Sequence, residues 1–503
     1  MLQSNYAINY LNKKIDLLKS NLNAESFWCG SFLTADVFER VMQAVCYYIN
    51  GQLSYILQHD VEGLETYDYE YFSWSIKKGQ IIPHRKKLIF LMMKACYRWG
   101  LNLIRFSTLL FKKGSIEVLE PVSLITQVGG RFLVVDGSVD SFEQFLDNCP
   151  LEPLQGNQKI FVGGDINKVQ NRIVASKSPF SALLEINEIN FIDKLLLILL
   201  HFKNLFLMLS LPFVNFNMIM LSRDFIDMAI IEMLNRKGLL KDLMFLHSLS
   251  GTVPIWASFL PERTFRSHMV WYSVNSRPLL FKDQPVVVHQ PIFKFNQFDV
   301  HWVWTDEEKR WVSDCQDKPV NAVACGPILF GQDSDVEPEK SLVRKILLFD
   351  TPPHEKDFII SSDSYLNYVN LDVSINLIKD TISAVEKVER KTGEKIEVLL
   401  KPKKAIGRKG MIPEYFDYLY MLIEKKRLTV LPLTHNIAEI ISSTDCLIAH
   451  PFSTSTKYAH HIGKTGVHYD PTGRVLDDPY DGGETILLSG RNDLERFIEK
   501  FYE

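Results

Sequence analysis

The fold of the C-terminal half is most legible in the stretch STDCLIAHPFSTSTKYAHHIGKTGVHYDPTG, residues 443–473. A short apolar run at 446–449 ends in His450-Pro451, and hydroxyl residues then lead into a helix-like segment at 455–462. A second apolar run follows at 466–469. A strand, a helix and another strand in so short a stretch indicate a βαβ unit, the building block of a parallel sheet.

The same alternation extends through the rest of the C-terminal part. Strands that alternate with helices favour a parallel sheet covered on both faces, in the Rossmann manner. Short apolar runs predict strands at 300–304, 322–325, 345–349, 396–400, 428–431, 446–449 and 466–469. Apolar residues three and four positions apart predict helices at 374–390, 413–425, 436–442, 455–462 and 492–502.

The N-terminal part predicts a second α/β domain behind a mainly helical segment at 1–120. Strands are expected at 132–135, 159–162, 218–221 and 243–246, with helices at 181–210 and 224–236. Prolines cluster in 275–291, so the boundary is placed there, giving domains at 121–280 and 281–503. The last helix is expected to cross back onto the first domain. The predicted fold class is α/β of GT-B type, with two Rossmann-like domains facing a cleft.

The bulk composition excludes several classes of protein. A net charge of −4 over 503 residues gives no basic surface for nucleic acid. Seven cysteines without a CxxC pair, and a charged N-terminus where a signal peptide needs an apolar core, predict a cytoplasmic protein. Polar residues interrupt the apolar stretch 191–221, which favours a buried helix and strand over a membrane span. A surface helix resting on a bilayer is the alternative for this stretch.

His450 and the residues after it are the first candidate site. His450 ends a predicted strand, and Ser453, Thr454 and Ser455 stand where the next helix begins. Free amides and the positive end of the helix dipole make such a place an anion site. Pro451 would turn the chain away from the sheet. The plainer interpretation is a hydroxyl cap followed by a helix, with a turn proline before it.

Two further strand ends carry residues suited to a phosphate or a nucleotide. Lys401 and Lys403 follow the predicted strand 396–400, and cations at that end of a strand suit a polyanion. Gly326 and Pro327 follow another strand, where the backbone could approach a ligand closely. A solvated basic loop is the alternative for the two lysines.

Candidates for a general base lie in the N-terminal half, after apolar runs. Asp224 and His247 each follow such a run, and Glu262 lies in the next polar stretch. Each of the three has a purely structural role as its alternative. HExxH, paired CxxC, GxGxxG and P-loop motifs are absent, so neither a metal nor a cofactor is expected.

Several blocks of the sequence resemble bacterial surface-carbohydrate (lipopolysaccharide and capsule) biosynthesis proteins. They occur in one order from about residue 216 to 473, and include MLSRDFIDMAII, FLHS, PIWASFLPER, HMVWYSVNS, DVHWVWTDEEKRWV, CGPILF, LLKPK and the opening stretch. The His-Pro pair followed by serine and threonine is also similar to bacterial GT-B enzymes that use CMP-sugars, the sialyltransferases and Kdo transferases.

That resemblance implies a function. His450, Pro451, Ser453, Thr454 and Ser455 become nucleotide-binding residues for CMP-Kdo or a CMP-nonulosonic acid. It implies inverting transfer, without an essential metal, to a glycan or lipid-linked glycan of the cell surface, in the cytoplasm or at the inner face of the membrane. The acidic element that carries the base in the sialyltransferases has only a loose relative at 134–140, so the base stays open.

Three other functions fit the same residues. A CDP-alcohol phosphotransferase of the teichoic-acid polymerase type would also place histidines and hydroxyls at this position. A transferase using a UDP- or GDP-hexose is the second alternative, and a non-catalytic subunit that binds polysaccharide is the third.

Overall fold

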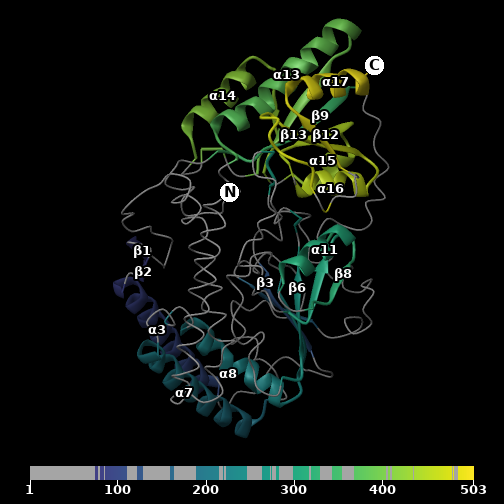
Figure 1. Cartoon of the computed structure of the whole chain (residues 1–503). Coiled ribbons are helices and arrows are strands. Elements are labelled where there is room, and N and C mark those ends of the chain that lie inside the picture. The colour runs from purple at the N-terminus through teal and green to yellow at the C-terminus, as the bar shows by residue number, and fades with distance from the viewer. Residues whose placement is uncertain are drawn as a thin grey trace.

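The computed structural model describes the chain in segments. These are residues 74–77, 80–83, 85–109, 122–128, 159–163, 189–214, 219, 222–245, 263–271, 273–274, 279–282, 298–316, 319–328, 343–353, 368–403, 406–407, 411–433, 435–451, 453–478, 480 and 485–502. Within them lie two six-stranded sheets and a two-stranded one. The expected GT-B-type fold class, with two Rossmann-like domains, is confirmed (Figure 1).

The C-terminal sheet has the strand order of a Rossmann domain. Its strands are β9 (Arg344–Phe349), β10 (Ile396–Lys401), β11 (Thr429–Val430), β12 (Cys446–Ala449), β13 (Thr465–Asp470) and β14 (Ile486–Ser489). All pair in parallel, in the order β11-β10-β9-β12-β13-β14. Numbered from β9, this is 3-2-1-4-5-6, and the order reverses between β9 and β12. Ligands of such sheets bind at the carboxyl ends of the strands beside that reversal.

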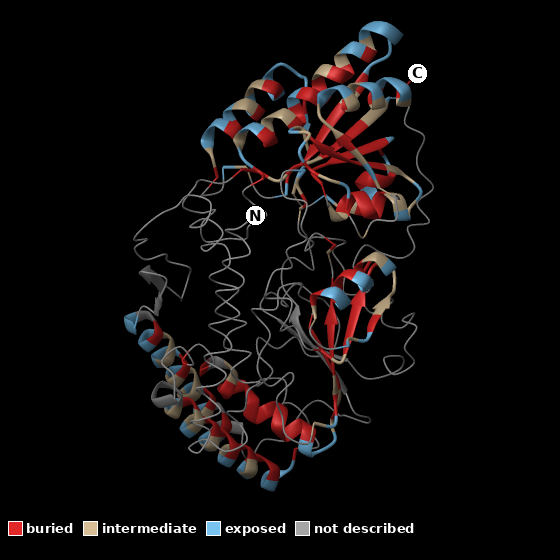
Figure 2. Ribbon diagram, viewed as in Figure 1, coloured by how far each residue is buried: buried red, intermediate tan, exposed pale blue. Residues whose placement is uncertain are grey.

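Helices cover both faces of this sheet. One face packs against α13 (Leu371–Thr392), α14 (Pro413–Glu424) and α17 (Arg491–Tyr502). The other packs against α15 (Ile437–Ser442) and α16 (Thr454–His461). Alternate residues of β9 show why both faces must be apolar, because Ile346 and Leu348 enter the first cluster while Leu347 enters the second. In Figure 2 the strands β10, β12 and β13 are largely buried.

The N-terminal sheet is also parallel. Its strands β3 (Val122–Val128), β4 (Lys159–Gly163), β5 (Leu240–Phe245), β6 (Arg266–Val270), β7 (Val300–Val303) and β8 (Ala322–Ala324) pair in the order β4-β3-β5-β6-β7-β8. Helix α11 (Asp306–Cys315) joins β7 to β8 and begins with a capping box between Thr305 and Glu308.

Three long helices form a layer at the lower end of Figure 1, below the N-terminal sheet. They are α3 (Arg85–Leu109), α7 (Phe191–Val214) and α8 (Ser222–Arg236). The Trp99 indole stacks on His201 and donates to the His201 carbonyl oxygen at 3.2 Å, which joins α3 to α7. A short hairpin, β1 (Trp74–Lys77) with β2 (Gln80–Pro83), precedes α3. None of the described helices is long and apolar enough to cross a bilayer.

The position of the domain boundary needs correction. Strand β7 pairs with β6, and β8 pairs with β7, so the N-terminal sheet continues to residue 324 instead of ending before 281. The prolines of 275–291 belong to the connection from β6 to β7. The helix α17 does not cross back, because Leu494, Ile498 and Tyr502 pack in the C-terminal core.

Most of the other predicted elements are present. The strand expected at 218–221 is wrong, since Ile219 lies in a helical turn and α8 already begins at Ser222. The strand β14 was not expected, and neither was the hairpin before α3. The strand expected at 132–135 lies outside the described residues.

Helix α16 packs directly on β13 at Gly466. A Cβ atom at this position would lie 2.9 Å from the Thr456 carbonyl oxygen and 3.1 Å from the Ala459 Cβ. Such distances leave no room for a side chain, so only glycine lets the helix lie this close to the strand.

Gly466→Ala should therefore lower the free energy of unfolding by about 1–3 kcal/mol, since the backbone of α16 must move. Gly100→Ala in α3 is the matched control, because a Cβ there meets no atom within 4 Å. The control should raise stability by up to about 1 kcal/mol through helix propensity. Denaturant unfolding measures both, and an unchanged stability of Gly466→Ala would refute the close packing.

Candidate functional site

His450 lies at the point where the strand order of the C-terminal sheet reverses. The pairing of β12 with β9 ends at Ala449 and Phe349, so the next residues along the two strands are His450 and Asp350. Both side chains are buried, with exposed fractions of 3% and 4%. The sequence predicted this position for His450 but did not single out Asp350.

Among the described residues, neither ring nitrogen of His450 has a hydrogen-bond partner. The ring of Tyr368 packs edge-on against it, at 6.4 Å between centroids. Burial, with a smaller contribution from the nearby Lys403, lowers the pKa of His450 to about 4, while Asp470 opposes the shift. His450 is therefore neutral at physiological pH and has one N–H to donate. Because buried polar atoms are normally paired, its two free nitrogens point to a ligand.

Asp350 holds the loop after β10 next to His450. One carboxyl oxygen accepts the backbone N–H of Lys403 at 2.9 Å, and the other accepts the Tyr415 hydroxyl at 2.7 Å. Burial raises the pKa of Asp350, although these hydrogen bonds oppose the shift. Lys403 itself is exposed, and its charge acts on both Asp350 and His450. Its predicted place at an anion site stays a prediction.

Lys401 is placed differently from Lys403. It is 3% exposed, and its ammonium donates to the Leu433 carbonyl oxygen at 2.7 Å. Burial lowers its pKa, and Asp350 partly opposes the shift. This hydrogen bond joins β10 to the segment after β11, so Lys401 has a structural role within the domain. The proposed phosphate contact from Lys401 has no support here.

The hydroxyl residues lie at the start of α16, as the sequence predicted. Ser453 is the N-cap residue but makes no side-chain cap, and its hydroxyl instead bonds Ser455 Oγ at 2.7 Å. The Ser453 backbone N–H donates to His468 Nε2 at 3.2 Å. The hydroxyl of Thr456 is buried without a partner. The simpler expectation of an ordinary hydroxyl cap is therefore wrong for Ser453, and donors remain at the positive end of the helix.

Asp470 closes this region from the side of β13. Its carboxylate accepts the Tyr368 hydroxyl at 2.5 Å, the Val475 N–H at 2.7 Å, and both the N–H and the hydroxyl of Thr472. Burial alone would raise the pKa of Asp470, but these hydrogen bonds outweigh it and lower the pKa. With these hydrogen bonds, the Asp470 carboxylate fixes the turn after β13 and the position of the Tyr368 ring. The Tyr368 ring lies against His450.

The N-terminal domain contacts α16 along its length. The Val274 N–H donates to Thr454 Oγ1 at 3.2 Å, at the beginning of the helix. At the other end of the helix, a Cβ on Gly326 would lie 3.8 Å from the His461 ring. Gly326 and the buried Pro327 therefore belong to the contact between the domains, away from the start of α16, and Pro451 is buried in the turn before it. The nucleotide role predicted for Gly326 and Pro327 is not supported by this position.

The predicted bases are not brought to His450 by the described structure. Asp224 is half-buried in the first turn of α8, and Figure 1 shows α8 in the lower helical layer, far from α16. Its role as the base is therefore unsupported. His247 and Glu262 lie outside the described residues.

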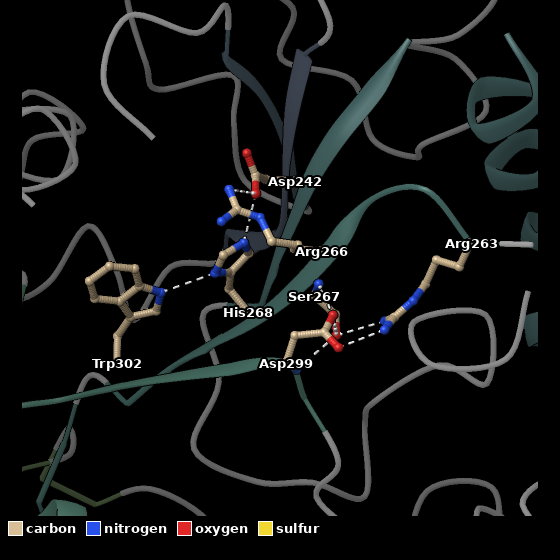
Figure 3. A network of polar contacts seen from close by, with 7 residues as sticks. All are labelled: Asp242, Arg263, Arg266, Ser267, His268, Asp299 and Trp302. Carbon is tan, nitrogen blue, oxygen red and sulfur yellow. Dashed lines mark hydrogen bonds and ion pairs between the residues drawn. The ribbon is translucent and has the colours of Figure 1, made fainter. Parts of the chain in front are cut away.

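A second buried polar network crosses the N-terminal sheet (Figure 3). Asp242 accepts from His268 Nε2 at 2.8 Å and from Arg266 at 2.9 Å, and the Trp302 indole donates to His268 Nδ1 at 3.3 Å. Beside it, Asp299 accepts from Arg263 at 2.6 Å. Asp242 and His268 are fully buried and lie in the interiors of β5 and β6, so this network holds strands together.

Two residues of the site were missed by the sequence analysis. Asp350 follows β9 in the run FDTPP, and His468 lies inside β13. A polar residue at a strand end was a usable signal for Asp350, whereas the pairing of His468 with Ser453 depends on tertiary structure. Within the described part of the chain, no group of three or more histidine, cysteine or acidic residues is arranged to hold a metal ion.

A model of the family described as "Polysaccharide biosynthesis PFTS motif protein" matches residues 202–498, more than half of the chain. The chain belongs to this family. The letters PFTS have their counterpart in Pro451-Phe452-Ser453-Thr454, which has the same four residue types with the last two exchanged. No curated protein matches the sequence.

Several solved structures resemble the chain at low similarity. A variant of the wall teichoic acid polymerase TagF soaked with CDPG has 9% identity and a TM-score of 0.38, covering 82% of this chain and 90% of its own. A glycosyltransferase from Rickettsia africae has 11% identity and a TM-score of 0.38, with coverages of 76% and 88%. The sucrose-phosphate synthase of Thermosynechococcus elongatus has 12% identity and a TM-score of 0.36, with coverages of 76% and 89%. Similarity this low does not transfer a substrate or a residue role.

The lowered pKa of His450 predicts a specific dependence of stability on pH. In the unfolded chain His450 takes up a proton near pH 6.5, whereas in the folded chain it does so only near pH 4. The stability that neutral His450 preserves above pH 6.5 is therefore lost as the pH falls towards 4, by up to about 3 kcal/mol.

His450→Asn should flatten this dependence, because asparagine does not titrate. Denaturant unfolding at a series of pH values from 7 to 4 measures it, and His435→Asn, at an exposed histidine after β11, is the matched control. A pH dependence that is the same in the wild type and in both variants would contradict the assignment.

Proposed function

We propose that this protein is a glycosyltransferase that moves a keto-sugar, of the Kdo or nonulosonic acid type, from a CMP-sugar to a growing surface glycan. The observation that carries the proposal is the buried, unpartnered His450 beside the start of α16 and the exposed Lys403. Membership of a polysaccharide biosynthesis family supports the process. The CMP-sugar rests on the similarity of the His-Pro and hydroxyl element to CMP-sugar transferases.

The site has the donors that a nucleoside monophosphate requires. Neutral His450 donates one N–H, Lys403 supplies a positive charge, and the first amides of α16 supply the positive end of a helix dipole. The exposed position of Lys403 lets a solvated phosphate reach it, while His450 lies deeper. A phosphate at this place would meet donors from the loops that follow β10 and β12, the two strands that flank β9.

In the proposed reaction, an acceptor hydroxyl oxygen forms a bond to the anomeric carbon of the sugar. The bond from that carbon to the phosphate oxygen breaks, and CMP leaves with the electron pair. The hydroxyl proton passes to a base, for which His247 and Glu262 remain the candidates. Donors placed around the departing phosphate stabilise its growing charge and are worth roughly 3–4 kcal/mol each where they are buried. Because CMP carries a single phosphate, we propose that this set works without a metal.

A panel of nucleotides tests the proposal directly. CMP, CDP, UDP and GDP are each added in excess to the full chain, with and without EDTA, and the thermal transition is recorded. We expect CMP to stabilise the protein, equally in EDTA, because stabilisation grows as RT ln(1 + [L]/Kd). A response to UDP or GDP alone would indicate that the donor is a UDP- or GDP-hexose and not a CMP-sugar. Failure of every nucleotide would favour a non-catalytic polysaccharide-binding subunit.

Donor hydrolysis separates the proposal from a CDP-alcohol phosphotransferase. A CMP-sugar transferase releases CMP and free sugar from its donor, whereas the phosphotransferase would release CMP and a phosphoalcohol from a CDP-alcohol. Hydrolysis of the CDP-alcohol alone would overturn the proposal in favour of attack on phosphorus.

Replacement of His450 should impair the chemical step. His450→Ala is expected to lower turnover by at least about 100-fold, the usual effect of removing one buried donor to a developing anion. Steady-state kinetics on the CMP-sugar measures it, with circular dichroism as the check on folding and His435→Ala as the control. Near-normal turnover in a folded His450→Ala protein would remove His450 from the mechanism.

A further inference from the structure

Exposed apolar side chains of the described residues gather on two helices. Of 17 large hydrophobic side chains that are exposed, 13 lie on α3 and α7. Those on α3 are Ile89, Phe90, Met93, Tyr97, Leu101 and Ile104, and those on α7 are Phe191, Ile192, Leu195, Leu199, Phe202, Phe206 and Leu209. We call this set the α3–α7 surface. So strong a concentration marks an interaction site, since single exposed apolar residues are normally scattered.

The spacing on α7 shows that these residues form one face. Ile192, Leu195, Leu199, Phe202, Phe206 and Leu209 recur at alternating intervals of three and four, which places them on one side of a helix. The opposite side is buried in the layer with α3 and α8, where Leu197, Leu200 and Met208 lie beside the polar His201 and Asn204. An amphipathic surface helix would be polar on its outer side, and α7 is not. Figure 2 shows exposed stretches along the outer sides of α3 and α7.

The charge of α3 complements the apolar face. Six cations lie on this helix, Arg85, Lys86, Lys87, Lys94, Arg98 and Arg105, and it contains no acidic residue. Arg98 pairs with Asp227 of α8, whereas Arg85, Lys86 and Lys94 are exposed. The whole chain, in contrast, has a net charge of −4. Apolar side chains with interspersed lysine and arginine are the combination that binds at the interface of an anionic bilayer.

We propose that the α3–α7 surface rests on a membrane that contains anionic lipids. A second copy of the chain fits this surface less well, because a two-fold contact sets a patch against itself and would bring the cations of two α3 helices together. In Figure 1 the two helices lie at the end of the molecule opposite the C-terminal sheet, so a bilayer there leaves α16 uncovered. This proposal does not depend on the identity of the nucleotide donor.

The test is sedimentation of the full chain with vesicles. Vesicles of phosphatidylcholine alone are compared with vesicles of two parts phosphatidylcholine to one part phosphatidylglycerol, at low and high salt. We expect binding to the anionic vesicles only, weakened by salt, because an anionic surface attracts nearby lysine and arginine side chains and salt screens that attraction. Equal sedimentation with both kinds of vesicle would show that anionic lipid is not required and would overturn that part of the proposal. No sedimentation with either kind would overturn membrane binding altogether.

A pair of double variants identifies the surface. Ile192→Ser with Phe206→Ser removes side chains that are 73% and 70% exposed on α7, and should weaken vesicle binding at least about tenfold. Tyr420→Ser with Ile423→Ser, at side chains 53% and 38% exposed on α14, is the control and should bind as the wild type does.

Two further measurements, of folding and of oligomeric state, distinguish membrane binding from the alternatives. Because all four side chains are exposed, both double variants should keep the wild-type circular dichroism and thermal transition. Light scattering without lipid gives the oligomeric state. A wild-type dimer that only the α7 variant dissociates would assign the surface to a second copy instead, and equal vesicle binding by both variants would also refute the proposal.

Discussion

The close contact between α16 and β13 at Gly466 is the constraint on which the rest of this structure depends. Because a Cβ there would meet the backbone of Thr456, the helix lies directly on the sheet. Its other side meets the N-terminal domain, and Tyr458 and Ala459 share one apolar cluster with Val270, Trp302 and Ile328. One short helix thus carries the hydroxyl residues of the candidate site and the contact between the domains. A movement of α16 would therefore change both the position of the hydroxyl residues and the contact between the domains.

The electrostatics of the site follow from burial at the reversal of strand order. Asp350 and His450 leave adjacent strands at the same level, in surroundings that disfavour charge on either group. Hydrogen bonds within the domain stabilise the buried carboxyl group of Asp350. His450 has no such bonds and remains neutral. In the proposed site, the charge that a phosphate needs would come from the exposed Lys403, because the buried Lys401 donates to the Leu433 carbonyl oxygen.

The C-terminal domain was predictable because its signals are local. Apolar runs and helical periodicity gave β12 its bounds, and His450 and Ser453 were found because polar residues after a strand fall at a ligand-binding edge. The boundary at 281 was wrong because strand pairing is not local, and nothing in 300–303 shows that this strand pairs with β6 instead of β9. The roles of Lys401 and Gly326 were missed for the same reason, since each depends on a partner more than 30 residues away.

According to the two proposals, the nucleotide donor and the lipid-linked acceptor reach the protein at opposite ends of the molecule. A nucleotide donor is soluble and needs a site open to the aqueous phase, which α16 and Lys403 provide in the C-terminal domain. A lipid-linked acceptor stays in the bilayer, and the α3–α7 surface belongs to the same half of the chain as β3 to β8. Since Val274 contacts Thr454 directly, the segment after β6 reaches the start of α16. An acceptor held by the N-terminal domain would therefore approach the donor along that segment.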